Sequence, residues 1–498
     1  MQWLTVLFVL ISVLVCASIA RSDESPRALD ADNFKCYIDE FNANDRELYP
    51  QYITNAASWR WMCENIPFFE CPDEDLTRTY YFRWWTFRKH IEKTPDGYVI
   101  TEFLPKVSWA GKYNTISCAA GHHFYEGRWI HNPIYLDDYA LFWFRKGGEP
   151  RLYSFWATNA IYARYLVTGD KDLILELLPD LVNNYKAWES DHLDESGLFW
   201  QIDDRDGMEV SIAGSGCRAT INSYMYGDAI AISNIAKLAG KDDLAREYAE
   251  KAKRIKHLVE TRLWDDKSEF FKVLPRGEGA KLADVRELHG YTPWYFELPD
   301  QEFSPAWKQI KDPAGFYAPY GLTTAEQRDA RFALSYQGHE CQWNGPSWPY
   351  STSVTLTAMA NLLQDYKQDV VTKSDYLDLL KIYARSQQLK LDDGRVVPWI
   401  DENLNSLTGD WISRTRLKSW KNGNWDPGKG GEERGKDYNH STFCDLIISG
   451  LVGLKPQPNN ELVVKPLIPD NTWDYFCLDN VLYHGHILTI LYDKTGNK

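Results

Sequence analysis

The sequence predicts an all-α protein in which helical hairpins close into an (α/α)6 toroid, followed by a small β element at the C-terminus. Two observations predict this fold. Helical segments recur in hairpins with a repeat of about 70 residues, and no single hairpin has a core of its own. The chain has 498 residues, of which 44% are hydrophobic, so it can bury a large shared core.

The first twenty residues are typical of a secretion signal. Residues 3–20 form an apolar run that ends in small residues, and residues 21–24 are abruptly polar. We therefore expect residues 1–20 to be a signal peptide and the protein to be secreted or to enter the secretory-pathway lumen. No other run reaches the roughly 18 apolar residues that a membrane helix needs, so no membrane association is expected after signal removal.

Cysteine usage suggests disulfide bonds in the N-terminal region. Cys36, Cys63 and Cys71 lie close together in sequence, and a secreted chain permits pairing among them. Cys217, Cys341 and Cys444 lie beside the starts of apolar helices and are expected to be free, packed thiols. We place residues 21–75 in an irregular N-terminal segment.

The toroid is expected over residues 76–455. Its clearest helices are paired, each pair consisting of an apolar helix, a turn and an amphipathic helix. The expected pairs are 155–167 with 171–188, 219–238 with 242–263, and 351–366 with 373–388. Segments 76–91, 136–144 and 442–454 extend the series. Residues 456–498 alternate like strands and form the predicted β-rich tail.

Composition excludes one class of function and favours another. The net charge is −15 without a basic run, which argues against binding to nucleic acid. The chain contains 21 Trp, 30 Tyr and 21 Phe, and flat rings with a polar tip suit a cleft that stacks on sugars. We therefore expect a carbohydrate substrate.

The densest aromatic and charged clusters fall in the loops that precede apolar helices. In a toroid such loops share one end of the ring, so these clusters should line one cleft. Carboxylates in that cleft predict glycosidic bond cleavage, which usually uses two of them. No nucleophile elbow, phosphate loop or dinucleotide motif is present, and we expect no cofactor or metal. The clusters lie at residues 125–129, 135–139, 203–209, 342–350, 399–403 and 436–440.

At three of these loops the sequence resembles the six-hairpin inverting glycosidases, in particular glycoside hydrolase family 63 and the mannosylglycerate-hydrolase-like enzymes. The motifs are Arg-Asp-Gly-Met-Glu at 205–209, Asn-Gly-Pro-Ser-Trp-Pro at 344–349 and Asp-Glu-Asn-Leu-Asn-Ser-Leu-Thr-Gly at 401–409. The resemblance implies an inverting hydrolase with Asp206 as general acid and Glu402 as general base. Because Asp203, Asp204 and Glu209 share the acid loop, the acid could be one of these neighbours.

Further residues of the loops are candidates for substrate binding. The tryptophans would stack on sugar faces, and the planar guanidinium of the arginine would hold a carboxylate or two hydroxyls. The candidates are Arg128, Trp129, Asp137, Glu209, Trp343, Asn344, Trp348, Asp401, Asp437 and His440.

Two alternatives remain open from the sequence alone. A polysaccharide lyase on a similar toroid would use a Tyr or His base and a cation-rich cleft, for which Tyr438, His440, His122 and Arg128 are available. A secreted carbohydrate-binding protein without catalysis is the other alternative, and the presence of both carboxylate loops argues against it.

Overall fold

The computed structural model describes residues 14–17, 27–419 and 423–496. It is 46% helix and 12% strand. The prediction of a helical toroid is therefore confirmed at the level of a mostly helical fold, although strands are more widely distributed than the sequence indicated. No helix in the described ranges is long and apolar enough to cross a membrane.

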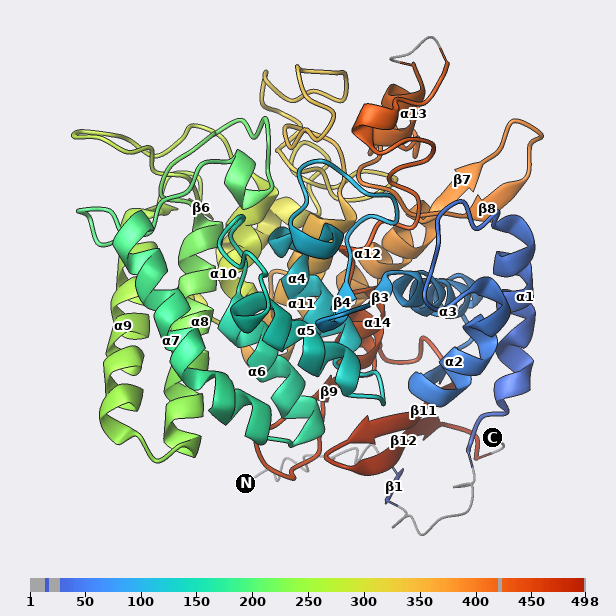
Figure 1. Ribbon diagram of the computed structural model, residues 1–498. Helices are drawn as coiled ribbons and strands as arrows, with labels where there is room; N and C mark the ends of the chain where they lie inside the picture. Colours follow the sequence, from blue (N-terminus) through green and yellow to red (C-terminus); the bar gives the residue numbers. More distant parts are fainter. Residues whose placement is uncertain (1–13, 18–26, 420–422, 497–498) are drawn as a thin grey trace, which may run out of the picture.

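Six helical segments of the described chain form an inner ring, in which each contacts the next and the last contacts the first (Figure 1). These helices are buried on nearly every side, so they lack the one-sided apolar stripe of a surface helix. The members are α4 (Ser117–Gly127), α6 (Ala157–Thr168), α8 (Ala219–Leu238), α10 (Thr292–Tyr295), α11 (Pro349–Asp365), and α14 (Phe443–Asp445) continued by the π-helix η8 (Leu446–Leu451).

Outer helices pack against this ring. In α9 the buried residues Ala245, Tyr248, Ala252, Ile255 and Val259 are spaced by three, four, three and four positions, so one face packs inward. The outer helices are α3 (Glu74–Lys89), α5 (Ile134–Arg145), α7 (Asp172–His192), α9 (Asp242–Arg262) and α12 (Lys373–Ser386), with the 3-10 segment η6 (Gln301–Ile310).

The expected turn between helices 155–167 and 171–188 is present between α6 and α7. Gly169 ends α6 in a left-handed conformation with φ of 71°, which a residue without a Cβ adopts at no steric cost. One inner helix that the sequence did not predict is α4. It contains two glycines and is buried on nearly all sides, so neither propensity nor periodicity marks it.

The C-terminal β element also recruits strands from the N-terminal part of the chain. The antiparallel sheet has the order β1 (Leu14–Ala17), β12 (His486–Asp493), β11 (Tyr475–Tyr483) and β2 (Phe68–Glu70), and Cys477 lies opposite Glu70. Four small hairpins complete the strands: β3 (Ile91–Thr94) with β4 (Gly97–Ile100), β5 (Trp264–Asp265) with β6 (Phe270–Phe271), β7 (Gln388–Lys390) with β8 (Val396–Pro398), and β9 (Leu454–Lys455) with β10 (Val463–Val464).

The N-terminal region differs from the expectation of an irregular segment. It contains α1 (Lys35–Asn44) and α2 (Ser58–Asn65), both packed on α3. Of the expected signal peptide, residues 14–17 form β1, and the remaining residues lie outside the described ranges.

The expectation of disulfide bonds is wrong for the described chain. Eight cysteines of the described chain, including Cys36, Cys63 and Cys71, are free thiols that form no disulfide bond. These three lie on different elements and have other contacts: Cys36 donates to the Asn33 carbonyl, and the Cys71 thiol lies beside the Thr77 hydroxyl. The expectation of free thiols at Cys217, Cys341 and Cys444 is confirmed.

Candidate active site

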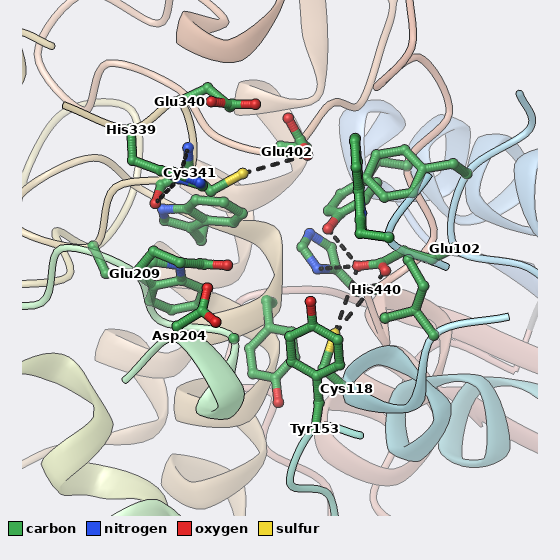
Figure 2. A pocket seen from close by; sticks show the side chains of 18 of the residues that line it. Glu102, Cys118, Tyr153, Asp204, Glu209, His339, Glu340, Cys341, Glu402 and His440 are labelled. Carbon is green, nitrogen blue, oxygen red and sulfur yellow. Dashed lines mark hydrogen bonds and ion pairs between the residues drawn. The ribbon is translucent and has the colours of Figure 1, made fainter. Parts of the chain in front are cut away.

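A cavity of about 280 Å³ opens among the loops that enter the inner helices. In Figure 1 these loops and α13 (Ile412–Ser419) lie at the top of the view, and the sheet of β11 and β12 lies at the bottom. Carboxylates line two sides of this cavity: Figure 2 shows Glu209 and Asp204 on one side and Glu402 and Glu102 on the other. The structure therefore contains one cavity, at one end of the ring, that is lined by acidic and aromatic side chains as expected.

Glu402 lies on the loop after β8 and is almost fully buried, with 1% exposure. Its Oε2 accepts a hydrogen bond of 2.5 Å from Nη2 of Arg434, whose side chain is also buried. The Cys341 thiol donates to the other oxygen over 3.8 Å. Because a buried carboxylate is costly without a cation, Arg434 supplies the counter-charge that this position requires.

Glu209 has a different environment. It lines the cavity on the loop after the 3-10 turn η4 (Asp204–Asp206). Its pKa is raised well above the usual value, first by burial and then by the negative charges of Asp204, Glu402 and Glu102. A raised pKa is the direction that a general acid requires.

The backbone at Glu209 is strained. The next residue, Val210, has φ of 61°, a left-handed conformation that costs a β-branched residue about 1–2 kcal/mol. The main-chain carbonyl of Glu209 accepts a hydrogen bond of 2.9 Å from the amide of Trp343, which fixes the loop against the loop before α11. Strain that is held in place in this way is typical of functional segments.

Asp206, the acid implied by the family resemblance, lies outside the cavity lining. It is fully buried, and its Oδ2 accepts a hydrogen bond of 2.8 Å from Nε of Arg218. The hydroxyls of Ser154 and Thr220 donate to the same carboxylate. With both oxygens occupied by the protein, Asp206 anchors the loop, and its neighbour Glu209 faces the cavity.

Glu102, just after β4, also lines the cavity and was not predicted from the sequence. Tyr438 and, over 3.9 Å, the Cys118 thiol donate to its Oε1. Burial raises its pKa to about 8, with the charge of Glu402 contributing further. No repeat or motif surrounds this residue, so only its aromatic neighbours could have drawn attention to it.

Aromatic rings form one wall of the cavity. Trp343 and Trp348 stack with centroids 4.5 Å apart and an interplanar angle of 15°. His440 lies 5.9 Å from the Trp348 ring, and burial lowers its pKa well below the usual value, so its ring is neutral. Both tryptophans and His440 line the cavity, as the sequence analysis proposed.

The remaining predicted residues lie beside or far from the cavity. Asp401 accepts hydrogen bonds from the Glu402 amide and the Ser413 hydroxyl, and burial raises its pKa to about 6. Three others support the fold. Asn344 accepts from Gln342, Asp437 accepts a hydrogen bond of 2.5 Å from Lys89, and Asp137 pairs with Arg164.

Arg128 and Trp129 belong to the end of the ring remote from the cavity. Both follow α4 and donate to Asp445, at 2.7 Å from the guanidinium Nη2 and 2.6 Å from the indole nitrogen. The sequence predicts both residues on a loop at the cleft, but the helical course of α4 carries them away from it. In the described residues no group of three or more His, Cys, Asp or Glu side chains is arranged to hold a metal ion.

Comparisons with known proteins agree with this architecture. Residues 112–441 match the family model of the mannosylglycerate hydrolase MGH1-like glycoside hydrolase domain. A solved structure described as a sialidase is 45% identical with a TM-score of 0.87, covering 94% of this chain and 42% of that one. The chain thus spans less than half of that protein.

More distant similarities concern the fold alone. A family 78 rhamnosidase from Bacillus sp. GL1 is 11% identical with a TM-score of 0.56, covering 85% of this chain and 40% of that one. The mannosylglycerate hydrolase of Thermus thermophilus, in complex with Tris and D-glycerate, is 13% identical with a TM-score of 0.51, covering 74% of this chain and all of that one.

Among curated proteins, an uncharacterized protein of Borreliella burgdorferi is 28% identical over 151 residues, which is 29% of this chain and 30% of that protein. The family match extends over well more than half of the chain and includes the loops of Glu209 and Glu402. The chain therefore belongs to the mannosylglycerate hydrolase MGH1-like glycoside hydrolase domain family.

Proposed function

We propose that this protein cleaves a glycosidic bond of an uncharged sugar with inversion, using Glu209 as general acid and Glu402 as general base. The observation that carries the proposal is the contrast between the two carboxyls in one cavity. Glu402 is paired with Arg434 at 2.5 Å, whereas the pKa of Glu209 is raised by desolvation and by neighbouring carboxylates. A carboxyl with a raised pKa suits the role of acid, and a carboxylate held by a cation suits the role of base.

In this mechanism Glu209 donates its proton to the oxygen of the departing group. Glu402 takes a proton from a water molecule as that water attacks the anomeric carbon from the opposite face. The bond to the leaving group breaks as the bond to water forms, so the configuration inverts. Inverting enzymes hold the two carboxyls about 6.5–9.5 Å apart to leave room for the water.

The charges in and beside the lining support an uncharged sugar. Arg434 binds Glu402, Lys429 pairs with Glu340 at 3.1 Å, and Arg205 lies 3.7 Å from Asp204. Burial raises the pKa of Glu102 to about 8 and that of Glu209 well above its usual value. The buried guanidinium of Arg434 is already paired with Glu402, so it is not available to a sugar carboxylate. This disfavours an anionic substrate such as a sialic acid, although the similar longer protein is described as a sialidase.

The same charges disfavour the lyase alternative, because a lyase needs a cation for the uronate carboxylate. The site residues also argue against a protein without catalysis, since the carboxyls that we propose as acid and base line one cavity. We propose that Asp206 holds the acid loop in place through Arg218 and does not act on the substrate. Secretion through a signal in residues 1–20 also remains our proposal, testable by N-terminal sequencing of protein recovered from the culture medium.

The test compares Glu209→Gln and Glu402→Gln with the wild-type enzyme on a panel of neutral and anionic aryl glycosides. We expect kcat to fall by about a thousandfold or more in both variants, because each loses a proton-transfer group. Proton NMR of the first product should show the anomer opposite to that of the substrate. A first product with retained configuration, or full activity in either variant, would refute the assignment.

A further inference from the structure

We propose that the ring contains a second binding site, for a small neutral polyhydroxylated molecule such as a monosaccharide or polyol, at the end opposite the catalytic cavity. This inference does not depend on the catalytic assignment. A cavity of about 250 Å³ lies among α4, α6, α11 and η8 and extends to β9. Its volume corresponds to about eight water molecules, enough for one sugar ring.

Aromatic rings separate this second cavity from the catalytic one. Tyr350 lines the catalytic cavity, and its ring lies 4.2 Å from that of His122. The ring of Trp156 follows at 5.3 Å from His122, and Tyr295 at 5.2 Å from Trp156. Tyr295 lines the second cavity, so the two cavities occupy different positions along the interior of the ring.

The walls of the second cavity offer hydrogen-bonding groups that the protein leaves free. Thr357 Oγ1 is buried and has no hydrogen-bond partner among the described residues. The amide nitrogens of Asn361 and Gln364 donate to backbone carbonyls of Tyr295 and Ser449 at 2.9 and 3.0 Å. Their amide oxygens receive no donor from the described part of the chain, so both remain available to hydroxyl groups.

Arg128 adds a donor and a stacking surface. Its guanidinium lies 4.6 Å from the centroid of the Tyr125 ring, and its Nε and Nη2 donate to Asp445. No hydrogen bond from Nη1 to another described residue is present, so this nitrogen is left for a ligand. Hydroxyl-binding groups beside aromatic rings, here Tyr125 and Tyr295, are the combination that sugars require.

The charges of this cavity indicate a neutral ligand. Arg128 is paired with Asp445 at 2.7 Å. Lys455 is paired with Asp365 and, at 3.4 Å, with Glu297. Since each cation in the lining already has a carboxylate, an anion would have to displace one of them, whereas a neutral polyol needs only the free groups.

The backbone gives independent support. η8 is a π-helix, a rare and widened form that occurs frequently at functional sites. Leu446, Ser449 and Gly450 of η8 line the second cavity. The widened turn therefore coincides with the wall of the proposed site.

The experiment uses crystals of the full protein soaked in D-glucose, D-mannose or glycerol, together with calorimetric titration of the same compounds. The concentrations must exceed a dissociation constant of about 1 mM, typical of weak sugar binding. We expect density for at least one compound in contact with Thr357 and Asn361. Crystals in which all three compounds leave only water in this cavity would overturn the proposal.

Two variants identify the site in solution. Thr357→Phe should fill the cavity and abolish the binding event assigned to it. Thr357→Val removes only the hydroxyl and should weaken that binding by about threefold to tenfold, the value of one hydrogen bond. Circular dichroism and thermal unfolding check that both variants fold. If the Phe variant does not fold, the Val variant decides: an unchanged affinity in its titrations would contradict the role of Thr357.

Discussion

The buried ion pair between Asp206 and Arg218 allows a quantitative test of the two roles assigned to the acid loop. Both side chains have zero exposure. Replacing Asp206 with asparagine keeps the shape and one acceptor but leaves the guanidinium without its counter-ion. Breaking such a buried pair costs about 3–5 kcal/mol. Because Arg218 keeps its bonds to Ser211 and the Gly214 carbonyl, we expect a loss near the lower limit.

This loss of unfolding free energy lowers the unfolding temperature, Tm, by a measurable amount. The entropy of unfolding is about 2.1 cal/mol/K per residue, so a chain of this length has a total near 1 kcal/mol/K and each kcal/mol lowers Tm by about 1 °C. We therefore expect Asp206→Asn to lower Tm by about 3 °C in differential scanning calorimetry, while Glu209→Gln leaves it almost unchanged. In hydrolysis assays the order should reverse, with the larger loss of kcat in Glu209→Gln.

The outcome that would refute this reasoning is specific. If Asp206→Asn unfolds at the wild-type temperature and loses as much activity as Glu402→Gln, Asp206 is the acid and the position of its side chain changes when substrate binds. If Glu209→Gln is also fully active, the cavity-facing carboxyl has no catalytic role.

The contacts described above support three further predictions. The pKa of Glu102 is raised to about 8, so protonation of this carboxyl stabilises the folded state. The free energy of unfolding should therefore fall as pH rises from about 4.5 to 8. In urea titrations, Glu102→Gln should make this decrease with pH smaller. Trp343→Ala should raise KM about tenfold with a smaller effect on kcat, since stacking binds ground and transition states alike, and an unchanged KM would exclude stacking. Dithiothreitol should not alter Tm, because the described cysteines are free; a fall in Tm would indicate a disulfide.

The helical hairpins were predictable because their patterns are local. The range 219–238 was predicted and is α8, and 242–263 differs from α9 only at its last residue. Glycine turns and a one-sided apolar face mark such elements in the sequence. In contrast, α4 has no such face because it lies inside the ring, and its omission displaced Arg128 and Trp129 to the wrong end of the molecule.

Motifs predicted that Glu402 and the two tryptophans would lie at the cavity, but they did not indicate which carboxyl of the 203–209 loop lines it. Asp206 and Glu209 are three positions apart, and the direction of each side chain depends on the tight turn of η4 and the left-handed Val210. The partner of Asp206, Arg218, is twelve positions away, and no pattern connects them. Glu102 contacts Tyr438, a residue more than three hundred positions later, so no local pattern could place it at the cavity.

The ring closes through contacts between α14 and α4, and the sheet joins β2 to β11. The first and last parts of the chain are therefore neighbours, and the nascent polypeptide remains an open arc until its final quarter has been synthesised. Such distant pairings form late, since a long loop must close before they give any stability. A ribosome-bound chain would thus expose apolar inner surfaces for most of its synthesis, which makes assistance by chaperones a natural requirement for its biogenesis.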